Sequence, residues 1–258
     1  MPERTSYPEG APNWVDLGTP DLDAAKLFYG RLFGWTFTDT GPEHGYYVLC
    51  ELDGLPVAGL GPLQDPGVPS MWSTYLASGD ADHTAGRIRD AGGRVLMEPL
   101  DVADAGRMLY AVDPTGAGFG VWQAEGHLGS RRTGEPGAPA WHELRTPDGA
   151  TADEFYRAVF GHEHEQIGDG RTFDYAVIRV ADEPVGGRLR VGSDDPSGVR
   201  PHWLTYFAVA DTDAAAAVVA EAGGTVRRDP VDTPYGRLAV VADPCGAAFT
   251  VIQLPQLS

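Results

Sequence analysis

The phrase WVDLGTPDLDAAKLFYGRLFGW, residues 14–35, returns without a gap as WHELRTPDGATADEFYRAVFGH, residues 141–162. Both copies begin with Trp, carry TPD in the middle, and continue through FY to FG. In each, a short and partly alternating run precedes an Asp in the position of a helix N-cap. A segment bearing Ala, Phe and Tyr follows and ends at Gly34 or Gly161, as helices commonly do. The phrase therefore predicts a strand followed by a helix, in two places.

A second phrase is also present twice. WSTYLASGDADHTAGRIRDAGGRV, residues 72–95, matches WLTYFAVADTDAAAAVVAEAGGTV, residues 203–226. Each copy leads to a DPxG turn and a closing run, DPTGAGFGVWQ in the first half and DPCGAAFTVIQ in the second. Strand-like runs separated by turn residues follow every predicted helix. The chain is therefore predicted to be an α+β protein of four βαβββ modules, arranged as two duplicated halves.

The repeats also predict the domain boundaries. The first domain is expected at 1–126, with modules at about 12–62 and 69–124, and the second at 139–258, with modules at about 139–191 and 200–254. Residues 127–138 between them are polar and rich in Gly and Pro, and are interpreted as the linker. The repeats leave open whether modules pair within a half or cross over between halves.

Composition limits the partners and the compartment. The 258 residues contain 19 Lys and Arg against 37 Asp and Glu, a formal charge of -18 that repels nucleic acid and anionic membranes. No apolar run approaches the roughly 18 residues of a membrane span, and no secretory signal is recognised. Cys50 and Cys245 form neither a disulfide framework nor a zinc pair. We expect a cytoplasmic protein, either a monomer with pseudo-symmetric halves or a homodimer.

Taken in order, the strand-TPD-helix-FYxxxFG phrase, the AGG helix end and the DPxG phrase resemble the vicinal oxygen chelate superfamily. Glyoxalases, bleomycin-resistance proteins and extradiol dioxygenases belong to it. The resemblance covers about residues 14–253, and more narrowly the chain resembles two-domain actinobacterial members described as glyoxalase-like or hydroxylase. It implies that paired modules curl mixed sheets around a cavity, so that four modules form two cavities.

Catalytic members of that superfamily hold a divalent metal with a His on the first strand and a Glu on the last strand of each module. The resemblance places the first-strand ligand six residues before the capping Asp, and the last-strand ligand seven residues after the Asp of DPxG. The eight corresponding residues are Val15, Thr74, His142 and Thr205 on the first strands, and then Gly59, Gly120, Gly187 and Thr250. Because one imidazole among Val, Thr and Gly residues cannot hold such an ion, we expect neither a metal nor a cofactor.

His142 then has two interpretations. It is a neutral, hydrogen-bonded histidine in a wall, or it is the catalytic residue that orients a ligand oxygen or moves a proton. If the metal-ligand position implied by the resemblance faces the cavity, strand alternation places Leu144 on the cavity side too. It also places aromatic side chains beside small residues on the cavity wall. Core packing is the alternative for each tryptophan. The predicted ligand-binding residues are Val15, Trp72, Thr74, Trp122, His142, Leu144, Trp203, Thr205, Phe207 and Thr250.

Two other groups are interpreted as structural. The run HEHE, residues 162–165, has metal-like composition but is expected to be a solvated loop. Arg107 and Arg237 occupy matching Gly-Arg turns, where they either reach an acidic group of a ligand or hold a duplicated turn.

Three functions follow. The first is a metal-free protein that binds an apolar, aromatic small molecule and assists a natural-product tailoring step, such as hydroxylation of an aromatic polyketide. As an enzyme it would be a metal-independent oxidoreductase or lyase. The second is a drug-sequestering resistance protein of the bleomycin-resistance type. The third is a metal-dependent lyase or dioxygenase with a non-standard ligand set. Motifs of serine hydrolases, P-loop NTPases and zinc proteases are absent from the sequence.

Overall fold

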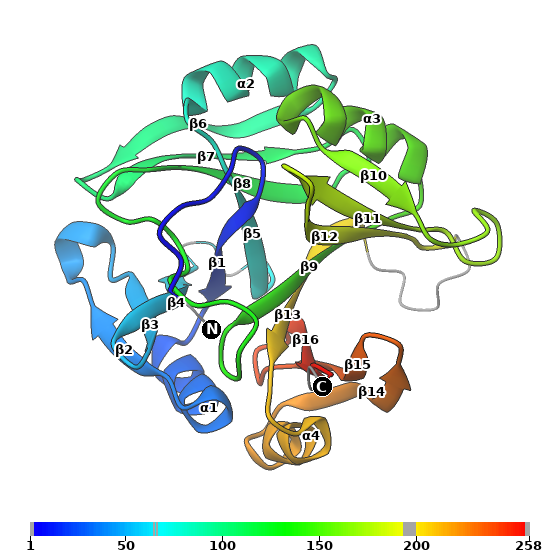
Figure 1. Ribbon diagram of the computed structural model, residues 1–258. Helices are drawn as coiled ribbons and strands as arrows, with labels where there is room; N and C mark the ends of the chain where they lie inside the picture. Colours follow the sequence, from blue (N-terminus) through cyan, green and yellow to red (C-terminus); the bar gives the residue numbers. More distant parts are fainter. Residues whose placement is uncertain (1–2, 64, 66, 193–199, 256–258) are drawn as a thin grey trace.

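The computed structural model describes residues 3–63, 65, 67–192 and 200–255, and the predicted α+β fold of four βαβββ modules is confirmed (Figure 1). A short 3-10 helix, Pro42–His44, interrupts the first module. The first half consists of β1 (Pro12–Thr19), α1 (Leu22–Phe33), β2 (Thr36–Asp39), β3 (Val48–Leu52), β4 (Leu55–Pro62), β5 (Met71–Ala77), α2 (Ala81–Asp90), β6 (Arg94–Val102), β7 (Gly106–Val112) and β8 (Gly118–Ala124). The second half consists of β9 (Pro139–Thr146), α3 (Gly149–Phe160), β10 (Glu163–Gln166), β11 (Tyr175–Val180), β12 (Glu183–Arg190), β13 (His202–Ala208), α4 (Thr212–Glu221), β14 (Thr225–Thr233), β15 (Gly236–Ala242) and β16 (Ala248–Gln253).

The helices begin and end at the predicted signals. An Asp side chain accepts a hydrogen bond from a backbone N–H of the first turn at each start, as Asp21 does from Ala24. Gly34 and Gly161, both at φ 72°, end α1 and α3. This left-handed conformation satisfies the last carbonyl groups at low steric cost for glycine. The equivalent caps at the other helix starts are Asp80, Asp148 and Asp211.

The first strands of the modules organise the sheet. Within the first half β1 pairs with β5 antiparallel, while β4 and β8 add to them in parallel. The second half repeats this arrangement with β9, β13, β12 and β16. A parallel bridge between His202 and Gly118 joins the halves into one continuous sheet. In the sheet, each module therefore pairs with the other module of its own half.

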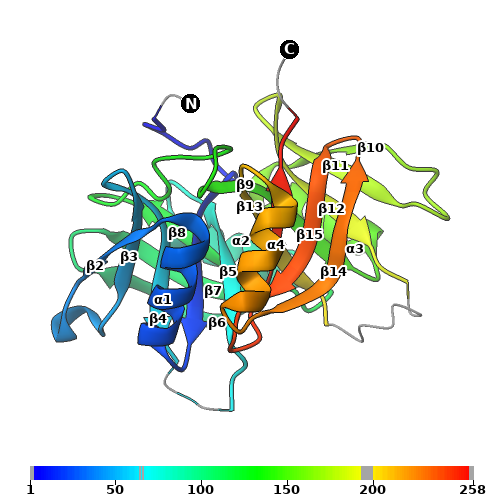
Figure 2. The same cartoon turned by 90° about the horizontal axis from the view of Figure 1, so that it is seen from below.

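The helices, by contrast, pack across the halves. α1 lies against α4, and α2 lies against α3, as Figure 2 shows for the first pair. The core has two matching parts, one between the first and fourth modules and one between the second and third. Their largest buried aromatic residues include Phe28, Tyr29, Phe155 and Tyr156. Because both cores are shared between halves, neither half encloses its own apolar interior.

The connection between the halves packs on the first half. Ser130 donates from its backbone to Asn13 and from its hydroxyl to the Val57 carbonyl, at 2.8 and 2.7 Å. The Trp35 indole donates to the carbonyl of Gly137 at 2.7 Å. This segment is therefore held in place rather than free.

Within the described ranges, every helix is too short or too polar to span a membrane.

Candidate functional site

The central strand β1 has two unlike faces. Val15 and Leu17 point to the helices and are fully buried in the core. Trp14 and Asp16 point the other way, onto the concave face of the curved sheet. The faces alternate because successive side chains of a strand point to opposite sides. The concave faces are the candidate functional site, because each carries a carboxyl group that accepts a hydrogen bond from a tyrosine of a neighbouring strand.

A carboxyl group lies at the centre of the first concave face. The hydroxyl of Tyr75 donates to Oδ2 of Asp16 at 2.9 Å, and the hydroxyl of Tyr47 donates to the same oxygen at 3.3 Å. The indole of Trp14 in turn donates to the Tyr47 hydroxyl at 2.8 Å. Four side chains from β1, β5 and the start of β3 thus form one hydrogen-bonded group, which we call the first floor.

The second half places the equivalent residues on its concave face, where they form two hydrogen-bonded pairs. Tyr206 donates to Oε2 of Glu143 at 2.9 Å, and the Trp141 indole donates to the hydroxyl of Tyr175 at 2.9 Å. Glu143 is buried, while Trp141, Tyr175 and Tyr206 stay partly exposed. These four residues are the second floor. Duplication has therefore kept a Trp, two Tyr and one carboxyl on each concave face.

Burial shifts both carboxyl groups toward the neutral form. Although the Asp16 side chain is partly exposed, it lies beneath the tyrosine rings, and desolvation raises its pKa to about 6 against the hydrogen bonds from Tyr75 and Tyr47. Burial also raises the pKa of Glu143, opposed by Arg145 and by the hydrogen bond from Tyr206. A carboxyl that titrates near neutrality can accept or release a proton under physiological conditions.

The floors do not offer the donor set of a divalent-metal site. A Cβ at Gly59 would overlap the Tyr47 hydroxyl, one at Gly187 would overlap the hydroxyl of Tyr175, and one at Gly120 would overlap the ring of Tyr75. Tyrosine rings therefore occupy the space in which last-strand carboxylates would stand. Across the described ranges, no three His, Cys, Asp or Glu side chains come together in a way that could hold a metal ion. One hydrogen-bonded carboxyl per face does not suit such an ion.

Most of the predicted site residues lie on the face of their strand opposite the floors, and their roles in ligand binding stay predictions. The residue that faces the concave side is Trp14 or Trp141, seven residues before the capping Asp, and not the next residue along. A shift of one residue moves every side chain of a strand to the opposite face. Trp122 does lie on the concave side, packed with Trp14 and Tyr75, and Thr250 is the register partner of Tyr206. The residues that lie instead on the helix-facing side are Val15, Trp72, Thr74, His142, Leu144, Trp203, Thr205 and Phe207.

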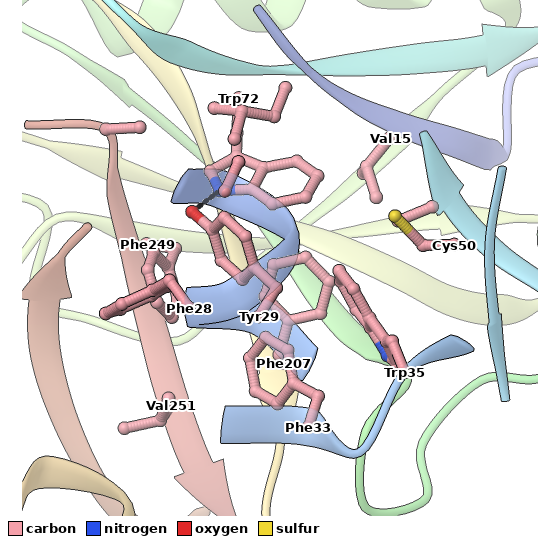
Figure 3. Packing of buried hydrophobic residues seen from close by; sticks show 14 of the residues in the cluster. Val15, Phe28, Tyr29, Phe33, Trp35, Cys50, Trp72, Phe207, Phe249 and Val251 are labelled. Atoms are coloured by element: carbon pink, nitrogen blue, oxygen red, sulfur yellow. Dashed lines mark hydrogen bonds between the residues drawn. The ribbon is translucent and has the colours of Figure 1, made fainter. Parts of the chain in front are cut away.

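The tryptophans predicted to stack on a ligand are structural donors. Trp72 donates to the hydroxyl of Tyr29 on α1 at 3.0 Å, inside the aromatic cluster drawn in Figure 3. Its counterpart Trp203 donates to the hydroxyl of Tyr156 on α3 at 2.9 Å. Core packing, the alternative interpretation, accounts for both.

His142 is buried on β9, between strands of its own half. Its register partner is Thr205, as Thr74 is the partner of Val15 in the first half. Burial lowers the pKa of His142 to about 4, so the imidazole is neutral. In the part of the chain that the structure describes, its Nδ1 and the Thr205 hydroxyl have no hydrogen-bond partner. His142 therefore lies apart from the floors, and its catalytic role stays a prediction.

The two turn arginines, Arg107 and Arg237, and the HEHE run also have structural roles. Arg107 bonds Asp82 and Asp101, and Arg237 bonds Asp213 and Asp232, which ties each turn to a helix start. Residues 163–165 of the HEHE run lie in strand β10 and not in a loop, and His162 directly precedes this strand. This histidine is buried and contacts the carbonyl of Gly10 at 2.8 Å.

Hollows among the described residues are lined by side chains other than the floor carboxyl groups. One, of 290 Å³, is lined by Tyr7, Asn13, Trp122 and Leu128, and another, of 430 Å³, lies beside Arg237 and Gln253. Neither contains Asp16 or Glu143. Tyrosine side chains cover the glycines Gly59, Gly120 and Gly187 of the floors.

The sequence contained a signal for the floors. The runs Trp-Val-Asp and Trp-His-Glu both place an acidic residue two positions after a Trp on a half-buried strand, and the duplicated WxTY phrases bring a Tyr to each. A buried carboxyl needs a partner, so the duplicated Asp and Glu pointed to a polar group on that face. Their tyrosine partners come from other strands and could not be assigned from spacing.

Comparison with known proteins agrees with the fold and with the repeat. The family model described as Glyoxalase/Bleomycin resistance protein/Dioxygenase superfamily matches residues 11–121 and again residues 138–251. The chain belongs to this superfamily. CFP32 of Mycobacterium tuberculosis (strain CDC 1551 / Oshkosh) is 42% identical over 259 residues, covering 98% of each chain. The anthracycline biosynthesis protein DauV of Streptomyces sp. (strain C5) is 42% identical over 265 residues, covering 97% of this chain and 95% of DauV.

Solved structures show the same superfamily fold at low identity. The 2,3-dioxygenase LapB from Pseudomonas sp. KL28 matches 96% of this chain and 93% of its own, with a TM-score of 0.67 and 12% identity. The Mn(II)-bound glyoxalase from Novosphingobium aromaticivorans matches 96% of this chain and 85% of its own, with a TM-score of 0.64 and 18% identity.

Proposed function

We propose that this glyoxalase-superfamily protein binds a hydroxylated aromatic small molecule on its concave faces without a metal and assists a natural-product tailoring step. Hydroxylation of an aromatic polyketide is the example that relatives named for anthracycline biosynthesis favour. The observation that carries the proposal is the duplicated floor, in which a carboxyl group of raised pKa lies among aromatic rings.

The chemistry of the floors suits a phenol or a hydroxyquinone. Aromatic rings gain from stacking on Trp and Tyr, and a phenolic hydroxyl can donate to a carboxylate. Asp16 and Glu143 would accept that proton, while the tyrosine hydroxyls hold the carboxyl oxygens in position. The chain itself then supplies binding, orientation and a proton acceptor.

Sequestration of an aromatic drug is the second candidate. It is favoured by one observation, that the carboxyl groups and tyrosine hydroxyls of the floors are already hydrogen-bonded to one another. A binding wall needs no free base, whereas a catalyst must exchange one of these bonds for a bond to substrate.

Calorimetry with 1,8-dihydroxyanthraquinone tests the proposal. Asp16→Asn and Glu143→Gln remove the proton acceptors with little change of shape, and each should weaken binding about tenfold, the value of one hydrogen bond to a charged group. His142→Val, on the helix-facing side, is the matched control and should bind as the parent does. If both floor variants bind like the parent while the control binds more weakly, the proposal is wrong. Conversion of a ligand recovered from the host would distinguish assistance from sequestration.

A further inference from the structure

The two concave faces differ at one position that decides charge. Arg145 stands on β9 two residues after Glu143, and so on the same face. The equivalent residue of the first half is Gly18, where a Cβ would lie 2.9 Å from Leu63. In the first half, the apolar side chain of Leu63 therefore fills the place that the Arg145 guanidinium takes in the second half.

The guanidinium of Arg145 is poorly matched by the protein. Its Nε lies 3.7 Å from Oε1 of Glu143, which is longer than a hydrogen bond, and this Nε has no hydrogen-bond partner within the described structure. By contrast, Arg188 on β12 binds Asp153 and Asp174 at 2.5–2.9 Å. Among the described residues, the Arg145 guanidinium thus lies beside the second floor with Glu143 at 3.7 Å as its only ion-pair partner.

The second face is also the more open one. Trp14 and Tyr75 of the first floor are buried, because His127 of the connection lies 4.4 Å from the Trp14 ring and Trp122 packs beside it. Trp141 and Tyr206 of the second floor are partly exposed. At its edge Phe173, 49% exposed, stacks on Tyr175 with 5.9 Å between ring centres.

From this asymmetry we infer that the second concave face binds an aromatic ligand carrying a carboxylate, with the anionic group on Arg145 and the ring against Trp141 and Tyr175. The inference rests on the proposed function and narrows it to one face and one class of ligand. A guanidinium binds a planar carboxylate through two parallel hydrogen bonds. In a chain of net charge -18, a local cation is what makes an anion favourable at this place.

The test compares two probes of one ring system, 2-naphthoate and neutral 2-naphthol, by calorimetry near neutral pH. Arg145→Ala should weaken binding of 2-naphthoate by about tenfold to a hundredfold, the range for a charge-assisted contact, and leave 2-naphthol within about twofold. Arg145→Lys should restore part of the loss for 2-naphthoate because it keeps the charge but loses the fork. Arg89→Ala, which removes the same charge from an exposed ion pair on α2, should change neither probe.

Each other outcome has a distinct meaning. Equal loss of both probes in Arg145→Ala, or no loss of either, contradicts the assignment of Arg145 to an anionic group but leaves aromatic binding on the floors intact. Failure of both probes to bind the parent protein at millimolar concentration contradicts the inference and the proposed function together. Equal loss of 2-naphthoate in Arg89→Ala would make the effect one of net charge and would likewise overturn the assignment.

Discussion

Tyr29 of the first module donates a hydrogen bond of 3.1 Å to Asp243 of the fourth module, so the two halves of the chain are joined inside their shared core. Trp72 extends this hydrogen-bonded series by donating to Tyr29. Asp243 also accepts hydrogen bonds from backbone N–H groups of its own DPxG turn. The third and second modules repeat the arrangement with Trp203, Tyr156 and Asp113. The FY and DPxG phrases therefore recur because each half supplies the tyrosine of one hydrogen-bonded joint and the aspartate of the other.

Tyr29→Phe should destabilise the whole protein. It leaves the Trp72 indole and Oδ2 of Asp243 buried without their partner, which costs about 1–3 kcal/mol of unfolding free energy. Chemical denaturation measures the loss, and Tyr46→Phe, at an exposed tyrosine, is the control. A loss of ligand binding at unchanged stability would instead place Tyr29 in the site.

His142→Val, which copies Val15 of the first half, should make the protein more resistant to acid. The folded pKa of His142 is lowered to about 4 by burial, below its ordinary 6.5. The unfolded chain therefore gains protons first, and stability is lost as pH falls from about 6.5 toward 4. Denaturation at several pH values should show the variant gaining on the parent over that window, while the exposed His83→Ala does not. A parallel pH profile for variant and parent would contradict the burial of a neutral imidazole.

Asp16→Asn should have the opposite pH signature. The folded pKa of Asp16 is raised to about 6 by burial, so its contribution to stability is full below the unfolded pKa of 3.8 and is lost as pH rises through 6. Asparagine keeps an acceptor for Tyr75 and cannot ionise. The variant should therefore become more stable than the parent by roughly 1 kcal/mol above that pH, a figure reduced for partial exposure. Loss of stability in the variant at every pH would show that the carboxylate itself is needed.

The sequence predicted the architecture because repeats and helix caps are local. Asp21 and Gly34 mark a helix by their own chemistry, and the duplicated phrases fix the number of modules. The concave floor was not predictable in the same way. Tyr47 and Tyr75 reach Asp16 from other strands, and nothing in spacing ranks these tyrosines above others. Placing the first-strand site residue six rather than seven residues before the capping Asp moves the predicted site to the helix-facing side of the strand.

The six tryptophans allow the central claim, that ligands bind on the concave floors and not on the helix-facing side, to be tested in one measurement. Each indole N–H gives its own signal in a two-dimensional ¹⁵N–¹H NMR spectrum, assigned by single Trp→Phe variants. Titration with 1,8-dihydroxyanthraquinone should shift concave signals, first that of the partly exposed Trp141, and then those of Trp14 and Trp122. The signals of Trp35, Trp72 and Trp203, buried in the cores, should stay in place. Shifts of Trp72 and Trp203 with an unmoved Trp141 would contradict the account.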